Sequence, residues 1–246
     1  MDGDFQVNYV KDTRPCLVVP LLALLGACDD MGVDPSLLSG PRVLAIRAEP
    51  RVLPEADAPD APVMLEALVH DATSFDWQLC AAPWQGADNG ASLACASGAV
   101  AIGTGNPMIF TPPDELDSFY VLLTAGEALP AVLRLTRSAD APLPNPEVTA
   151  LQTEDGSPLP TSLTPEQALA IDVVATNPSE TELVATLYTT GGGIDPWRSV
   201  LPSGSTITAP AEPGPFKVTA VVRDEAGGTG WRTETIEVAP AATVTP

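Results

Sequence analysis

The stretch GPFKVTAVVRD, residues 214–224, decides the fold of this 246-residue chain. Along it, apolar side chains alternate with side chains that are mostly polar. This period of two is typical of a half-buried β-strand. The positions expected to face a core are Phe216, Val218, Ala220 and Val222, and those expected to face outward are Lys217, Thr219, Val221 and Arg223. The following residues, DEAGG at 224–228, predict a turn, after which residues 231–238 return as a last strand.

Comparable runs of three to eight residues, bounded by Pro, Gly and Asp, occur along most of the chain. They are residues 43–49, 63–70, 75–80, 108–110, 119–123, 132–136, 148–153, 169–175 and 183–189. No stretch carries a helical stripe with caps at both ends, and residues 114–116 predict one helical turn at most. Residues 81–106, rich in Gly, Ala and Asn, predict a loop. The sequence therefore predicts an all-β fold of two tandem antiparallel β-sandwiches.

The composition and a proline-rich segment predict where the two sandwiches divide. Residues 139–146 contain three prolines within five residues, which favours an extended, semi-rigid linker. We expect the first sandwich over residues 41–138, the second over 147–240 and a short tail over 241–246. Each is about 100 residues long, which is enough for a hydrophobic core.

Residues 214–224 and the Gly-rich hairpin after them resemble bacterial immunoglobulin-like or fibronectin-III-like modules. The resemblance implies a β-sandwich for the second unit. In the first unit, Trp77 and Cys80 are similar to the core tryptophan and cysteine of immunoglobulin domains. The remaining cysteine, Cys95, lies only 15 residues further on, so a bond between the two would close a local loop rather than join two sheets.

The N-terminus predicts export. Residues 16–28 contain an apolar run of about a dozen residues, too short to span a bilayer that needs roughly 20. Lys11 and Arg14 precede the run, and small residues close it, which is typical of a secretory signal peptide over residues 1–27. The alternative is a buried N-terminal strand or helix.

The ending LGAC, residues 25–28, resembles the lipobox of bacterial lipoproteins. This resemblance implies that Cys28 is lipidated, becomes the mature N-terminus and anchors the chain to a membrane, with residues 28–40 as a tether. The location it implies is the bacterial cell envelope, facing the periplasm or the cell surface. Whether the membrane is the inner or the outer one stays open.

Under this interpretation two cysteines are left in an oxidising compartment, Cys80 and Cys95. We expect them to form a disulfide. Free buried thiols and metal ligation are the alternatives, although no second Cys/His pair with zinc-site spacing is present.

The net charge of −21 excludes one large class of partners. Loss of residues 1–27 removes two basic and three acidic side chains and leaves −20. No basic cluster offsets this charge, so we expect no nucleic-acid binding. We expect this net charge mainly to keep the protein soluble.

The sequence offers little for catalysis. His70 is the only histidine and ends a predicted strand, no Gly-x-Ser-x-Gly elbow is present, and there is neither a zinc ligand set nor a phosphate-binding glycine loop. We predict no enzyme, no catalytic residue, no cofactor, no metal site and no small-molecule substrate. Acidic clusters such as Asp57 with Asp60 leave calcium-binding loops as an alternative to solvated loops.

Tryptophans near predicted loops and strand ends are the candidate contact residues, chiefly Trp84 and Trp197, with Trp231 as a third. They are either core plugs or contacts for a glycan or protein partner. The sequence therefore predicts a non-catalytic, membrane-anchored envelope lipoprotein that acts as a binding or spacer module, with another envelope protein as partner. The alternative is a carbohydrate- or calcium-dependent adhesive module, and a hydrolase is less favoured.

Overall fold

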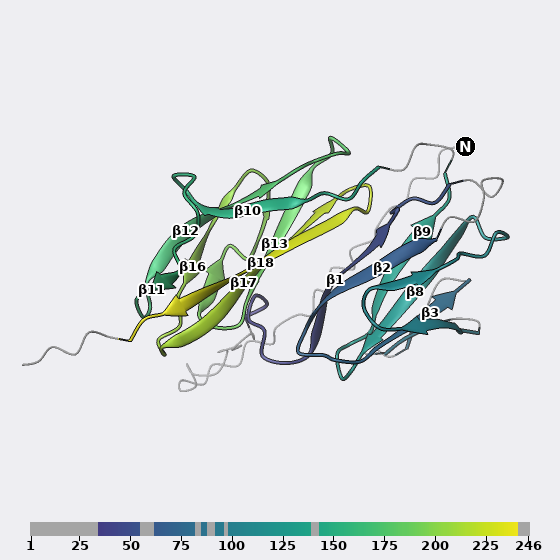
Figure 1. Ribbon diagram of the computed structural model, residues 1–246, viewed down its shortest axis with the longest axis horizontal. Helices are drawn as coiled ribbons and strands as arrows, with labels where there is room; N and C mark the ends of the chain where they lie inside the picture. The colour runs from purple at the N-terminus through teal and green to yellow at the C-terminus, as the bar shows by residue number, and fades with distance from the viewer. Residues whose placement is uncertain are drawn as a thin grey trace, which may run out of the picture. The chain divides into compact units, whose positions relative to one another are not determined.

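The structure is a computed structural model that describes residues 34–54, 62–81, 85–87, 92–95, 98–138 and 143–240. Within these ranges every regular element is a β-strand, so the predicted all-β fold is confirmed (Figure 1). The predicted signal peptide, Cys28 and the tail over 241–246 lie outside the described residues.

The first sandwich pairs two sheets of antiparallel strands. Its strands are β1 (Arg42–Glu49), β2 (Val63–His70), β3 (Phe75–Cys80), β4 (Gln85–Ala87), β5 (Ser92–Ala94), β6 (Val100–Thr104), β7 (Met108–Phe110), β8 (Ser118–Ala125) and β9 (Ala131–Thr136). One sheet has the order β1-β2-β7 and the other β6-β3-β8-β9, while β4 and β5 form a separate hairpin.

Its core follows the alternation expected from the sequence. Val63 and Leu65 of β2 and Phe119 and Val121 of β8 are fully buried, because every second side chain of these strands points between the sheets. Trp77 is buried as well, and its indole Nε1–H donates a 2.7 Å hydrogen bond to the carbonyl oxygen of Gly105. This bond satisfies the one polar atom that the indole carries into the core.

The prediction of a continuous loop over residues 81–106 is wrong, because this stretch contains β4, β5 and β6. Strand β6 pairs with the edge of β3 through a register shift between Ala101 and Gly103, and Gly103 has a positive φ of 155°. A side chain at Gly103 would press on Met108. Strand β6 is short and contains a glycine, so its sequence alone does not predict a strand.

The second sandwich contains the two longest described strands, β17 (Gly214–Asp224) and β18 (Thr229–Val238). Its other strands are β10 (Val148–Thr153), β11 (Ser162–Leu163), β12 (Ala168–Ala175), β13 (Leu183–Thr189), β14 (Gly193–Asp195), β15 (Arg198–Val200) and β16 (Gly204–Thr208). The sheet orders are β10-β12-β16-β14 and β11-β18-β17-β13-β15. All pairs are antiparallel except β11 with β18, which is parallel.

Strand β17 supplies the centre of the second core. Its inward side chains, Phe216, Val218, Ala220 and Val222, are buried between the sheets as predicted. The predicted turn after it is also present, with the Gly227 amide donating to the carbonyl oxygen of Asp224 and the Asp224 amide donating to that of Gly228.

Candidate functional site

The structure describes some of the candidate residues, namely Cys80, Cys95 and Trp197. The predicted disulfide between Cys80 and Cys95 is present, and it ties the end of β3 to the hairpin residues that follow. Trp197 lies in the turn between β14 and β15 and is partly exposed. Trp84 and Cys28 lie outside the described residues.

His70 is the last residue of β2 and is partly exposed. It stands opposite Arg42 in the register of β1 and β2. Asp71 follows it with a positive φ of 56°, which turns the chain away from the strand. His70 therefore lies at the end of a strand, as the sequence predicts.

The most extensive feature outside the two cores is a junction where β1 of the first sandwich meets β17 and β18 of the second. A β-bulge at Leu44 places both Leu44 and Ala45 on the outer face of β1. They pack there against Val221 of β17 in a third apolar cluster. Its other members are Leu38, Leu68, Tyr188 and Trp231.

An ion pair lies buried in the same junction. Arg51 Nη1 is 2.5 Å from Asp224 Oδ2, and the two side chains are 3% and 0% exposed. Asp224 also accepts hydrogen bonds from the Ser179 hydroxyl and the Gly228 amide. Burial raises the pKa of Asp224, but the bonds from Arg51, Ser179 and Gly228 outweigh it and hold the pKa below its usual value. Asp224 is therefore a carboxylate at neutral pH.

The linker residue Asn145 bridges the two sandwiches. Its side-chain amide donates to the carbonyl oxygen of Ala48 at 2.8 Å, and its side-chain oxygen accepts the Thr229 amide at 3.0 Å. A side chain at Gly230 would collide with the backbone of Pro146, so glycine is needed for the linker to lie against β18. The linker is thus fixed to both units at its end.

Two arginines add contacts across the junction. The guanidinium carbon of Arg47 lies 4.3 Å from the ring centroid of Trp231. Arg223 Nη2 donates a 2.7 Å hydrogen bond to the carbonyl oxygen of Leu44. Trp231, one of the candidate contact residues for a partner, therefore contacts Arg47 of the same chain.

Residues 36–38, which we assigned to the tether, pack against the second sandwich. The Leu38 amide donates to the carbonyl oxygen of Thr189, and the Thr189 amide donates to that of Ser36. Ser36 and Leu38 are buried. This stretch is held by β13 and does not extend freely.

The junction overturns the expectation that Thr219 and Val221 face outward into solvent. Val221 is fully buried under the first sandwich, and Thr219 is buried beside Thr233, with which its hydroxyl shares a hydrogen bond. A signal was present, since VTAVV at 218–222 is nearly continuous in apolar and β-branched residues. Such a run is typical of a strand covered on both faces.

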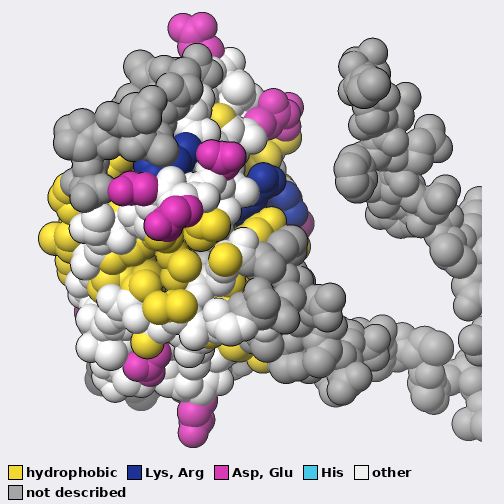
Figure 2. All heavy atoms as spheres, turned by 90° about the vertical axis from the view of Figure 1, so that its right-hand side faces the viewer, with side chains coloured by type: hydrophobic (Ala, Val, Ile, Leu, Met, Phe, Trp, Pro, Cys, Tyr) yellow, Lys and Arg dark blue, Asp and Glu magenta, His cyan; other side chains and the backbone are white. Residues whose placement is uncertain are grey.

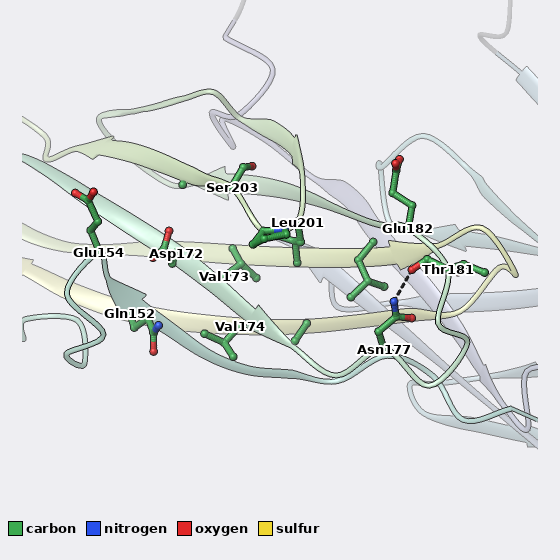
Figure 3. A pocket seen from close by; sticks show the side chains of 14 residues that line it. Gln152, Glu154, Asp172, Val173, Val174, Asn177, Thr181, Glu182, Leu201 and Ser203 are labelled. Carbon is green, nitrogen blue, oxygen red and sulfur yellow. Dashed lines mark hydrogen bonds between the residues drawn. The ribbon is translucent and has the colours of Figure 1, made fainter.

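A groove of about 650 Å³ opens at the side of the second sandwich, where the chain crosses from β15 to β16 (Figure 3). Val173, Leu183 and Leu201 form its apolar lining. Figure 3 shows the carboxylates of Glu154 and Glu182 toward opposite ends, and the side-chain amide of Asn177 bonded to the backbone of Thr181. Such a lining favours apolar or positively charged groups.

Hydrophobic side chains also reach the surface. On the face shown in Figure 2 they gather in one area that acidic side chains border. The large hydrophobic side chains most exposed in the first sandwich are Val100, Ile109 and Leu129. Exposed apolar area of this kind can contact a protein partner.

The described residues contain no group of three or more His, Cys, Asp or Glu side chains placed to hold a metal ion. None of their elements is a helix long and apolar enough to cross a membrane.

No protein-family model matches the chain, and no curated protein matches it. Among solved structures it is similar to the D0-D1 domain of intimin, with 14% identity, a TM-score of 0.30, and coverage of 80% of this chain and 99% of that one. The Yersinia pseudotuberculosis adhesin InvE shows 14% identity, a TM-score of 0.28, and coverage of 80% and 58%. Murine CEACAM1b shows 11% identity, a TM-score of 0.22, and coverage of 81% and 98%. No functional assignment rests on similarities this weak.

Proposed function

We propose that this chain is a non-catalytic, lipid-anchored protein of the bacterial cell envelope, in which two β-sandwiches joined at a fixed angle serve as a binding or spacer module. The observation that carries the proposal is the buried junction. An ion pair removed from water, an apolar cluster and the bridging Asn145 oppose independent movement of the two sandwiches. A chain that only tethered two binding units would need none of these contacts.

The fixed angle is tested by distance measurements between spin labels. Glu127 and Glu212 are exposed residues, one in each sandwich, that can be replaced by labelled cysteines. We expect one narrow distance distribution, and a broad distribution would refute a rigid spacer. Gly230→Ala should broaden the distribution, because a side chain there collides with Pro146.

The anchor is tested separately with Cys28→Ala. The unaltered protein should enter the detergent phase on phase separation, and mass spectrometry should find a mature N-terminus at a lipidated Cys28. The variant should stay in the aqueous phase. A mature protein that retains residues 1–27 with an unmodified Cys28 would overturn the anchor without affecting the junction.

We further propose an envelope protein as the partner, which crosslinking in intact cells would identify. The last strand is a poor place for such a partner to add a strand. The linker covers the start of β18 through Asn145, Arg232 of β18 donates to the carbonyl oxygen of Thr149 in β10, and β11 pairs with its end. We therefore expect the partner to contact exposed side chains rather than to add a strand beside β18.

The carbohydrate-dependent alternative has one observation in its favour. Trp197 is partly exposed and lines a cavity with other aromatic and basic side chains. Side chains of these types are enriched where proteins bind their partners most strongly.

A further inference from the structure

Three arginines gather at Tyr188 on the outer face of the second sandwich. The guanidinium carbon of Arg42 lies 5.3 Å from the ring centroid of Tyr188. Arg198 of β15 and Arg223 of β17 flank β13 on either side, as the strand registers require. Together with Trp197 these residues line one cavity of about 510 Å³.

The cavity holds a large share of the positively charged side chains of this acidic chain. Beyond residue 28 the sequence holds only nine Lys and Arg residues against a net charge of −20. Three of the nine line this single cavity.

Arg198 and Arg223 line the same cavity, and their like charges disfavour each other. Burial is the main cause that lowers the pKa of Arg223, the Tyr188 hydroxyl opposes this effect, and the positive charge of Arg198 lowers the pKa further. An anion between the two arginines would relieve this repulsion.

Three acidic residues also line the cavity, but none forms an ion pair with these arginines within the described residues. Asp224 is engaged by Arg51 in the junction. Glu182 and Glu225 are exposed at the rim, and no ion pair joins them to the arginines. The side chain of Arg198 in particular makes no hydrogen bond or ion pair within the described residues, so its guanidinium donors are available to a ligand.

The side chain of Trp197 indicates which class of anion the cavity binds. Its indole offers a flat apolar surface next to Arg198, and the C–H face of a sugar ring packs well on such a surface. A planar guanidinium in turn matches a carboxylate with two parallel hydrogen bonds. A ligand that combines both features engages the indole of Trp197 and the arginines together.

We propose that this cavity binds an acidic saccharide, with the sugar ring packed on Trp197 and its carboxylate held by Arg198 and Arg223. The inference deepens the carbohydrate-dependent alternative and does not depend on the lipid anchor, although Arg42 of the first sandwich contributes to the cavity. An acidic peptide would offer carboxylates but no ring for the indole.

The direct test is calorimetric titration of the full chain in detergent with three probes. They are tetragalacturonate as the acidic saccharide, maltotetraose as a neutral saccharide and tetraglutamate as an acidic peptide. We expect heat of binding from tetragalacturonate alone. Equal binding of the neutral sugar or of the peptide would refute the proposed ligand class, and absence of tetragalacturonate binding would refute the site.

Variants locate the binding. Arg198→Gln and Trp197→Ala should each weaken tetragalacturonate binding by at least about tenfold, the loss expected for one charge-assisted hydrogen bond or one aromatic contact. Arg134→Gln is the matched control, because Arg134 is exposed on β9 of the first sandwich and its loss changes the net charge equally. Circular dichroism would check that all three variants fold. Equal weakening by Arg134→Gln would show that binding depends on overall charge, and would overturn the assignment.

Discussion

The two sandwich cores and the junction between the sandwiches are built from different kinds of side chain. The clusters inside the sandwiches consist of apolar residues such as Phe119 and Phe216. The junction combines an apolar cluster with the buried charges of Arg51 and Asp224. Apolar burial is non-directional and stabilises any compact packing, whereas a buried ion pair is tolerated only in a narrow geometry. The cores therefore stabilise the fold, while the junction specifies how the sandwiches meet.

Truncation of one aromatic side chain in each core should give the largest effect. Phe119 is fully buried and packs edge-on to Phe110 with ring centroids 6.1 Å apart, and Phe216 is its counterpart in the second sandwich. Phe119→Ala and Phe216→Ala should each lower the free energy of unfolding by about 3–5 kcal/mol, because each leaves a cavity. Urea denaturation followed by tryptophan fluorescence and circular dichroism measures this loss.

The same experiment shows whether the junction couples the cores. We expect a single unfolding transition in both variants, seen at the same urea concentration by both probes. Two separated transitions would mean that the sandwiches unfold independently, and that the junction contributes little to stability.

Removal of one partner of the ion pair should come next in size. Asp224→Ala leaves the Arg51 guanidinium buried without its carboxylate, and should cost about 3 kcal/mol in the free energy of unfolding. Ser179→Ala is the matched control, since it removes only a neutral hydrogen bond to the same carboxylate and should cost about 1 kcal/mol. Equal small losses in both variants would contradict a buried charge pair.

The sequence predicted the cores far better than the junction, for a physical reason. Inward side chains recur at every second residue of a strand, so local alternation is enough to find Val63 and Leu65 or Phe216 and Val218. Arg51 and Asp224 are 173 residues apart, and no local pattern links them.

The bulge at Leu44 also escapes a prediction from local alternation. A bulge inserts one residue without changing the composition of the strand, so the alternation gives no sign of it. Of the candidate site residues, the disulfide pair followed from cysteine counting. The arginines that join Trp197 at its cavity come from three different strands and could not be grouped from the sequence.

Acidification should separate the junction from the cores. The folded-state pKa of Asp224 lies below its unfolded value of about 3.9, so the carboxylate stabilises the folded chain above about pH 4. This contribution is lost as the pH falls through the folded-state pKa. We therefore expect the stability difference between the unaltered chain and Asp224→Asn to be constant from about pH 5 to 8 and to shrink below about pH 4.

The difference between the two proteins is the useful quantity, because other carboxylates titrate in the same range. The pKa of Asp155 is also lowered, through hydrogen bonds from Thr153 and Ser157, and its contribution is common to both proteins. A stability difference that persisted unchanged to pH 2 would contradict the assignment of a charged Asp224 to the junction.

Loss of an exposed ion pair should have the smallest effect. Arg232 Nε lies 2.6 Å from Glu234 Oε1, close to the distance in the junction pair, but the side chains are 44% and 33% exposed. Water already solvates both charges, so Glu234→Gln should change the free energy of unfolding by less than about 1 kcal/mol, and 0.5 M salt should reduce even that. Urea denaturation at low and high salt measures the change. A loss as large as that of Asp224→Ala would mean that distance alone sets the strength of these pairs, and the contrast between junction and surface would then have no basis in burial.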